Sequence, residues 1–367
     1  LIDPMTMIRS DRNVLFSDSP DHSYKITTAM DPDLQQYLLS ILQNQKARNQ
    51  GKPRQIAFVV LEPATGRLLA MTGFDLDTPG RNPCTAADYP AASLFKIVTA
   101  AAAVERLGYR PGTPFYFNGG KYTLYKSQLR EIRNRYSLKV SFASAFAESV
   151  NPVFGKIGKN RLGREPLEQY ARAFGFNEQV PSELGFTSGS FSTSESAFHL
   201  AELGCGFNTD TTISPVFGAM MAAAVINEGR MPLPLVVEHV TNGSGKIIYK
   251  HKKETYKTAI TADTASILVS LMRKTITSGT AKKAFGHISR DKILSGLTIG
   301  GKTGSLYNKA HTVKYDWFSG FAKERGQTGR AIAFSILVGH GEYLGTRAAA
   351  FGKKIIKYYF KPDSTGS

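Results

Sequence analysis

Three short groups of residues in this chain carry side chains suited to acyl transfer through a serine. Ser93 precedes Lys96 by three positions in "SLFK", and residues at that spacing share one face of a helix. The lysine amine could then take the proton of the serine hydroxyl, which is a poor nucleophile without a base. Ser149 and Asn151 in "SVN" could direct two more polar side chains into the same cleft. The third group begins at Lys302, and its lysine and hydroxyl donors could hold a carboxylate.

This third group can also be read as part of a phosphate-binding loop. The group consists of Lys302, Thr303, Gly304 and Ser305. With Gly296 and Gly301 it completes the pattern Gly-x-x-x-x-Gly-Lys-Thr. A phosphate loop must open a helix, because its backbone N–H groups and the helix N-terminus hold the phosphates. Here Gly304 follows at once and no helical period comes after it, so we predict a site on a strand edge.

The elements expected around the three groups would position them in one cleft. "SLFKIVTAAAAVERLG" is an Ala-rich helix closed by Gly108, with Ser93 at its start. Ser149 and Asn151 lie between two helical stretches, and Pro152 is expected to break the local helix. Near residue 293 the hydrophobic period becomes two. "LTIGGKTG", "YDWFSGFAK" and "RAIAFSILVG" then predict three successive strands, and "GTRAAAFGKKIIKYYFK" predicts a final helix.

The upstream part of the chain predicts a helix and a hairpin. The pair Asp31-Pro32 begins the helix, and two apolar runs flank the turn Pro63-Ala64-Thr65-Gly66. Strands at both ends therefore bracket a mainly helical insert, which indicates an α+β fold with an antiparallel sheet flanked by helices. We expect an irregular segment over residues 1–24, one domain over 25–360 with its helical subdomain at about 105–285, and a tail over 361–367.

The composition restricts the partners that the chain can have. The formal net charge of +17 over 367 residues favours contact with a polyanion. Basic blocks run from Lys121 to Lys139, from Lys250 to Lys257 and from Lys353 to Lys361. None of them matches a nucleic-acid-binding motif, so we interpret them as solvated surface and expect no nucleic-acid partner. The histidines and cysteines have no metal-ligand spacing, and we expect neither a metal nor a cofactor.

Cys84 and Cys205 are the only cysteines. They fit either one disulfide in an oxidising compartment or two separate thiols, and we favour separate thiols because nothing in the local sequence pairs them. No run approaches the roughly 18 apolar residues that cross a bilayer, and no signal peptide is visible. The chain begins at Leu1 rather than at Met, so we expect a processed or engineered start with any anchor outside it.

With these groups in this order, the chain resembles the transpeptidase domain of penicillin-binding proteins, within the serine penicillin-recognising superfamily. The resemblance covers about residues 25–360, and further stretches carry it: "AFVVLEPATGRLLAM", "ASAFAESVNPVFGKIG", "TTISPVFGAMMAAAVINEGRMPLP", "TSGTAKKAF" and "DWFSGFA". The chain departs from the family at Ala92, where Gly is common, and at Ser305, where Thr is usual. No companion glycosyltransferase domain is visible, and the N-terminal part is too short for a large non-catalytic module.

The resemblance implies a role for each group. Ser93 would attack the carbonyl between the last two D-Ala residues of a peptidoglycan stem peptide. Lys96 would act as the base, and Ser149 would relay the proton to the departing amine. Asn151 would hold a substrate amide, and the side chains that would hold the terminal carboxylate are Lys302, Thr303 and Ser305.

The resemblance also places an oxyanion hole at the backbone N–H groups of Ser93 and Ser305. Lys96 and Lys302 have opposite tasks. We therefore expect Lys96 to be neutral, so that it can accept a proton, and Lys302 to stay charged, so that it can hold a carboxylate.

The implied function is that of a D,D-transpeptidase that cross-links the cell wall outside the cytoplasm and is acylated by β-lactams. Its expected partners are stem peptides, β-lactams and other cell-wall synthesis proteins, with the membrane close by through an anchor outside this chain. If water resolves the acyl-enzyme, the enzyme is a D,D-carboxypeptidase. A β-lactamase would need a Glu-x-x-Leu-Asn base, which is not found, or a tryptophan between the second and third groups, whereas Trp317 follows the third.

A β-lactam-sensing receptor domain would be acylated without turnover. It would need an anchor or a signalling region, and the sequence as given has neither. A pseudo-enzyme with a scaffold role is disfavoured because all three groups are intact.

Overall fold

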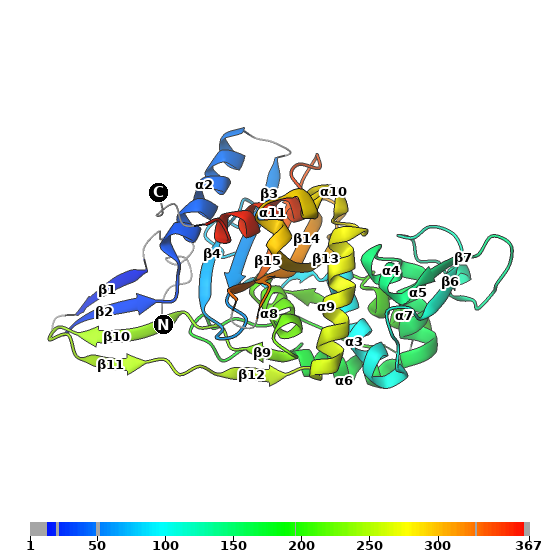
Figure 1. Cartoon of the computed structure of the whole chain (residues 1–367), viewed down its shortest axis with the longest axis horizontal. Coiled ribbons are helices and arrows are strands. Elements are labelled where there is room, and N and C mark those ends of the chain that lie inside the picture. The colour runs from blue at the N-terminus through cyan, green and yellow to red at the C-terminus, as the bar shows by residue number, and fades with distance from the viewer. Residues whose placement is uncertain (1–12, 20–21, 49–51, 195, 327–328, 363–367) are drawn as a thin grey trace.

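The computed structural model describes residues 13–19, 22–48, 52–194, 196–326 and 329–362. At its centre is a five-stranded antiparallel sheet in the order β13-β14-β15-β3-β4 (Figure 1). The strands are β3 (Pro53–Leu61), β4 (Leu68–Asp75), β13 (Leu297–Tyr307), β14 (Lys314–Glu324) and β15 (Ala331–His340). The expected hairpin and the three late strands are therefore confirmed, and β3 pairs with β15 to join them.

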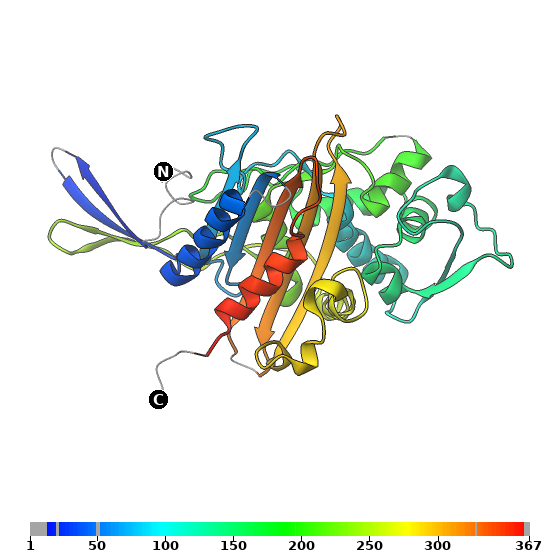
Figure 2. The ribbon, with the colours of Figure 1, turned by 90° about the horizontal axis from the view of Figure 1, so that it is seen from above.

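The central sheet is buried on both faces. Along β3, alternate side chains enter two different hydrophobic clusters, because successive residues of a strand point to opposite faces. Ile56, Phe58 and Val60 share a cluster with residues of α2 (Pro32–Arg48) and α11 (Ala348–Tyr359). Ala57, Val59 and Leu61 belong to the cluster that includes α3 (Lys96–Leu107) and α8 (Pro215–Ile226). Figure 2 shows α2 and α11 lying side by side over the first of these faces.

A lobe of helices lies beside β13 (Figure 1). Its longest helix, α9 (Ala262–Thr277), packs against β13. Besides α3, α8 and α9, the helices of the region between β4 and β13 are α4 (Phe142–Ala147), α5 (Asn151–Lys156), the π-helical η3 (Ile157–Leu162), α6 (Arg164–Phe174), α7 (Ala197–Cys205) and α10 (Lys282–Phe285). Short 3-10 turns are η1 (Ala92–Phe95), η2 (Lys126–Leu129), η4 (Ile288–Arg290) and η5 (Leu294–Gly296). The α+β class with helices flanking an antiparallel sheet is thus confirmed.

The expected irregular segment over residues 1–24 is wrong from Val14 onward. β1 (Val14–Ser19) and β2 (His22–Thr28) form a hairpin that continues into β10 (Val237–Asn242) and β11 (Ile247–Lys250). This four-stranded sheet projects from one end of the molecule (Figure 1). The boundary placed at residue 25 falls inside β2, while residues 1–12, 20–21 and 363–367 lie outside the described residues. The four strands of this sheet are half-buried or exposed along most of their length, and β2 and β10 pair across a long stretch of chain, so their sequence lacks a clear hydrophobic period.

The insert is also less helical than expected. It contains β9 (Arg230–Pro232), which pairs with β12 (Thr255–Thr258), together with β10 and β11. Smaller pairs are β5 (Tyr89–Pro90) with β8 (Thr212–Ile213), and β6 (Pro114–Phe117) with β7 (Leu138–Ser141). Pro152 marks the expected break, because α4 ends at Ala147 and a new helix, α5, begins at Asn151. It occupies the first turn of α5, where its missing N–H costs no hydrogen bond.

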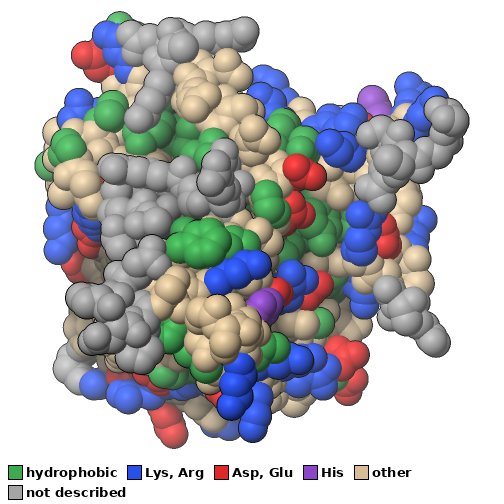
Figure 3. Space-filling view, turned by 90° about the vertical axis from the view of Figure 1, so that its left-hand side faces the viewer, with side chains coloured by type: hydrophobic (Ala, Val, Ile, Leu, Met, Phe, Trp, Pro, Cys, Tyr) green, Lys and Arg blue, Asp and Glu red, His purple; other side chains and the backbone are tan. Residues whose placement is uncertain are grey.

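The surface charge is distributed, as the separate basic blocks suggest. On the end of the molecule that Figure 3 shows, Lys and Arg side chains form several groups with other side chains between them. Among the described residues, no helix is long and apolar enough to cross a membrane.

Candidate active site

Ser93 sits on a tight turn that the surrounding chain fixes at several points. It lies in η1, directly before α3, which begins at Lys96. Ala92 has a φ of +49°, which L-residues rarely adopt. The Trp317 indole Nε1 donates to the Pro90 carbonyl at 2.9 Å, so the buried ring ties β14 to this turn. Ser93 thus stands at a helix start as expected, although a 3-10 turn comes first.

The glycine that follows α7, Gly206, leaves room for this tight turn. Gly206 follows α7 with a φ of +68°, and a Cβ built there would lie 1.9 Å from the Ala92 carbonyl oxygen. Any side chain at Gly206 would therefore push the Ala92–Ser93 peptide out of place. The Ala92 backbone is held in a conformation that glycine adopts freely, which gives a physical reason why glycine is common before the nucleophile in this family.

Lys96 is completely buried and meets three oxygen atoms. Its Nζ donates to Ser93 Oγ at 2.8 Å, to Asn151 Oδ1 at 2.8 Å and to the Cys205 carbonyl oxygen at 2.6 Å. Burial is the main cause that lowers the pKa of Lys96, to about 8. A sizeable neutral fraction is therefore present near pH 7–8, and its lone pair lies within hydrogen-bond distance of the serine proton.

The second group faces the same point from the loop between α4 and α5. Asn151 is held from behind, because its Nδ2 donates to the Tyr122 carbonyl at 3.0 Å and its backbone N–H to the Lys121 carbonyl at 2.7 Å. Ser149 has a φ of +56°, and its Oγ accepts from Lys302 Nζ at 2.9 Å. Ser149 is thus linked to Lys302, while Asn151 is linked to Lys96.

Strand β13 forms the opposite wall. Gly304 lets this strand lie close to the nucleophile turn, since a Cβ on it would lie 3.3 Å from the Ala92 Cβ and 3.4 Å from the Ser93 nitrogen. Gly300 and Gly301 leave room on the strand for two aromatic rings, because the rings of Phe321 and Phe318 occupy the space where side chains at these positions would lie. The phosphate-loop alternative is therefore wrong: the Lys-Thr-Gly-Ser group lies within a strand and opens no helix.

Lys302 departs from expectation. It is completely buried, and burial followed by the nearby Lys96 charge lowers its pKa well below the usual value. Lys96 donates to two carbonyl-type oxygens, whereas Lys302 donates to the Thr303 carbonyl at 2.9 Å and to the weaker hydroxyl acceptor of Ser149. The pair as it stands does not support a charged Lys302 beside a neutral Lys96. A carboxylate brought next to Lys302 would raise its pKa again, so the expectation applies to the substrate complex.

All the predicted groups meet at one cleft of about 850 Å³. The expected residues that line it are Ser93, Ser149, Asn151, Thr303, Gly304 and Ser305. Lys96 and Lys302 lie buried directly behind them. The sequence reasoning missed Tyr122, Glu202 and Asp210, which also line the cleft. It also missed the Cys205 carbonyl, because a backbone acceptor leaves no mark in the sequence.

The acidic wall of the cleft has its own electrostatics. Burial raises the pKa of Glu202, and the charge of Asp210 adds to this rise. His199 acts in the opposite direction and lowers the pKa of Glu202, but the net shift is upward. Among the described residues, no group of three or more His, Cys, Asp or Glu side chains is placed to hold a metal ion. Cys84 and Cys205 are buried free thiols, as expected. Cys84 Sγ points at the carbonyls of Phe58 and Thr72, well inside the sheet.

Comparisons with known proteins find relatives of this chain. The peptidoglycan D,D-transpeptidase PbpA of Mycolicibacterium smegmatis is 24% identical over 365 residues, covering 89% of this chain and 69% of the relative. Stage V sporulation protein D of Bacillus subtilis is 23% identical over 299 residues, covering 78% of this chain. The chain spans only 45% of that second relative's length.

Solved structures show the same fold. The crystal structure of PBPA from Mycobacterium tuberculosis superposes with a TM-score of 0.72 at 23% identity, covering 92% of this chain and 82% of that one. The profile of the family described as "Penicillin binding protein transpeptidase domain" matches residues 56–357. This match takes in all three groups of the cleft, and the chain belongs to the penicillin-binding protein transpeptidase domain family.

Proposed function

We propose that this chain is a serine D,D-transpeptidase that cross-links peptidoglycan stem peptides and that β-lactams acylate at Ser93. The observation that carries the proposal is the contact of Lys96 Nζ with Ser93 Oγ at 2.8 Å. It puts a buried amine with a lowered pKa beside Ser93, which lines the cleft together with residues of the other two groups. Relatives named D,D-transpeptidases, and a neighbour described as a ceftriaxone acyl-enzyme complex, support the same chemistry.

Acylation begins with two bond changes. Neutral Lys96 takes the hydroxyl proton while Ser93 Oγ attacks the carbonyl carbon of the D-Ala–D-Ala bond. The negative charge that develops on the carbonyl oxygen is met by the backbone N–H groups of Ser93 and Ser305, and one such donor is typically worth about 10²–10³ in rate. The terminal carboxylate of the substrate binds at Lys302, Thr303 and Ser305, and Asn151 holds a substrate amide.

Collapse of the tetrahedral intermediate breaks the peptide C–N bond. The proton held by Lys96 passes to the leaving D-Ala amine through Ser149, whose Oγ stays bonded to Lys302. An acceptor amine from a second stem peptide then attacks the ester carbonyl, loses a proton to the same bases and restores the Ser93 hydroxyl. If water attacks instead, the product is a shortened stem peptide, which is the carboxypeptidase outcome.

The proposed reaction also indicates where the protein acts. Stem peptides are cross-linked outside the cytoplasm, so we propose an extracytoplasmic location close to the membrane, with other cell-wall synthesis proteins as partners. Neither a metal nor a cofactor is needed by the steps above.

The test uses a fluorescent penicillin followed by intact mass measurement over several hours. One penicilloyl group per chain should form on the parent protein, none on Ser93→Ala, and the adduct should persist. An adduct on Ser93→Ala would contradict the assignment of the nucleophile. Rapid loss of the adduct would instead indicate a β-lactamase. A synthetic stem peptide offered with an acceptor amine then separates transpeptidation from hydrolysis by the mass of the product.

A further inference from the structure

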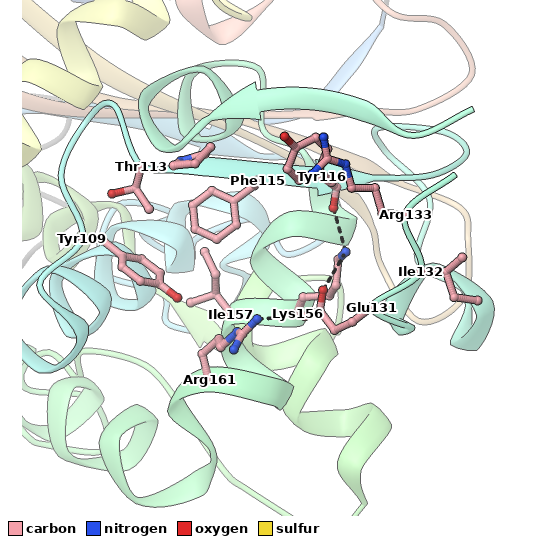
Figure 4. Close-up of a pocket in the computed structure, with 11 residues that line it drawn as sticks. Tyr109, Thr113, Phe115, Tyr116, Glu131, Ile132, Arg133, Lys156, Ile157 and Arg161 are labelled. Atoms are coloured by element: carbon pink, nitrogen blue, oxygen red, sulfur yellow. Dashed lines mark hydrogen bonds and ion pairs between the residues drawn. The ribbon is translucent and has the colours of Figure 1, made fainter. Parts of the chain in front are cut away.

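A second cavity of about 210 Å³ lies in the helical lobe and shares no lining residue with the active-site cleft. Figure 4 shows it between strand β6, the segment around Glu131 and the α5–η3 helix. Three cations line it, namely Arg133, Lys156 and Arg161, against the single carboxylate of Glu131. The proposed acyl-transfer chemistry makes no use of any of them.

The charges in this pocket are only loosely paired. The side chain of Lys156 is 7% exposed, and its Nζ donates to the Tyr116 carbonyl at 2.7 Å. Glu131 lies 3.5 Å from Lys156 Nζ and 3.5 Å from the Arg161 guanidinium, and Figure 4 shows both cations directed at it. Charge-assisted hydrogen bonds are normally about 2.7–2.9 Å long. One carboxylate thus sits at long range from two cations, which leaves donors for a second acceptor.

The backbone is unusual at the same place. Lys156 ends α5, and the chain continues as a π-helical turn in which the Gly163 N–H donates to the Gly158 carbonyl at 2.9 Å. Lys156 precedes this turn and Arg161 lies within it, and both approach Glu131. π-turns are rare and occur frequently at functional sites. This observation is independent of the charges.

Aromatic rings form the remaining walls. The Tyr109 and Phe115 rings meet edge to face with centroids 5.3 Å apart, and the Arg133 guanidinium lies 4.1 Å over the Tyr116 ring. A stacked guanidinium keeps its N–H groups in plane for an oxyanion. Ile157 closes the floor and is fully buried. The pocket therefore combines cationic donors with flat apolar walls.

The surroundings attract anions. The segment 121–139 contains six basic residues, Lys121, Lys126, Arg130, Arg133, Arg135 and Lys139, and its only acidic residue is Glu131. All seven are exposed. Such a one-sided field raises the local concentration of anions near the pocket.

We propose that this pocket binds a small ligand whose oxyanion, a carboxylate or a phosphate, contacts Lys156, Arg161 and Arg133 while its flat or apolar body lies against the tyrosine and phenylalanine rings. The competing explanation is purely structural: Glu131 would only fasten its loop to α5 and η3. The two accounts differ in whether an added anion is bound saturably, and whether exposed Arg161 governs that binding.

The experiment is a heteronuclear NMR titration of the whole chain with benzoate, phenyl phosphate and, as the uncharged isostere, benzamide. We expect saturable shifts around Lys156 and Arg161 with at least one anion and none with benzamide. Stronger binding of benzoate would indicate a carboxylate ligand, and stronger binding of phenyl phosphate a phosphate. If an anion also binds in the active-site cleft near Lys302, the NMR signals of residues around Lys302 shift, and these differ from the signals of residues around Lys156 and Arg161.

The variants decide between specific binding and general attraction. Arg161→Gln, at a side chain that is 54% exposed, should weaken binding about tenfold, the size expected for a lost charge-assisted hydrogen bond. Arg130→Gln removes one charge from the same block outside the pocket and should change the Kd less than about twofold. Equal effects of the two variants, equal binding of benzoate and benzamide, or no saturable binding of either anion would each overturn the proposal.

Discussion

Buried lysines occur at both ends of the short helix α5, and their partners differ. Lys96, beside Asn151 at the first end, donates to a hydroxyl, an amide oxygen and a carbonyl. Lys156, at the other end, has a carboxylate within 3.5 Å in addition to a carbonyl. In the described part of the chain, neither Lys96 nor Lys302 forms an ion pair with a carboxylate. A buried ammonium with no counter-charge gives up its proton easily, which suits a base.

The same difference teaches how burial can serve two purposes. At the cleft, desolvation lowers the pKa of Lys96 and of Lys302, which suits the proposed proton transfer from the hydroxyl next to Lys96. At the second pocket, a counter-ion accompanies the buried amine, and the remaining positive charge is available for an outside partner. Position in the fold therefore matters less than which oxygens surround each lysine.

The largest expected effect is that of Lys96→Arg. A guanidinium does not lose its proton in a protein, so the variant should acylate at least about 10³-fold more slowly with benzylpenicillin at every pH. Stopped-flow acylation kinetics measure this, with the exposed Lys283→Arg as the matched control. Acylation close to the parent rate would show that Lys96 is not the base.

Lys302 should be the next most sensitive. Lys302→Ala removes the partner of Ser149 Oγ and the group that we propose holds the substrate carboxylate, and we expect a loss of about 10²–10³ in the second-order acylation rate. Lys302→Arg retains a charge and should lose less. If the alanine variant is no slower than the arginine variant, the charge at Lys302 does not matter for acylation.

The pH profile sharpens the comparison without a mutation. Lys96 acts as a base only when neutral, so the acylation rate should rise with pH through the lowered pKa of about 8. It should gain roughly tenfold per pH unit on the acid side and fall again at high pH, as Lys302 loses the charge proposed to hold the substrate carboxylate. The rate is measured between pH 5.5 and 9.5 at constant ionic strength. A rate that does not change across pH 7–9 would mean that the titrating base is another group.

The smallest expected effect concerns Lys156. Lys156→Met should lower the free energy of unfolding by about 1–3 kcal/mol, because the Tyr116 carbonyl loses its partner and Glu131 loses a counter-charge. Urea unfolding measures it, with Lys159→Met as the neighbouring control. Unchanged stability would mean that the long contacts of Lys156 contribute nothing, and that the contrast between the two ends of α5 lies in geometry alone.

Much of the site was predictable because most of its functional groups are side chains, which the sequence names directly. Ser93 and Lys96 needed only a helix start, and the strand character of Lys302 to Ser305 followed from the period-two pattern around it. The carbonyls of Cys205 and Tyr122 could not be predicted, since every residue has one and only the fold selects which carbonyl faces inward.

The missed parts of the fold have a similar cause. Strands β1, β2, β10 and β11 are half-buried or exposed along most of their length, and their sheet is completed only by the pairing of β2 with β10 far along the chain. Their local residues therefore show no clear hydrophobic alternation. The order of the Lys96 and Lys302 pKa values likewise depends on hydrogen-bond partners that are brought together from separate elements.

The pairing of β3 with β15 determines when this domain can fold. Pro53–Leu61 leaves the ribosome or the translocation channel long before Ala331–His340, yet the two are adjacent in the central sheet. Until the last strands arrive, the β3–β4 hairpin presents an apolar edge with free backbone groups, which is prone to aggregation. Non-local sheets of this kind fold slowly. A chain truncated before β15 would therefore lack a finished sheet even though Ser93, Lys96, Ser149 and Lys302 were all already made.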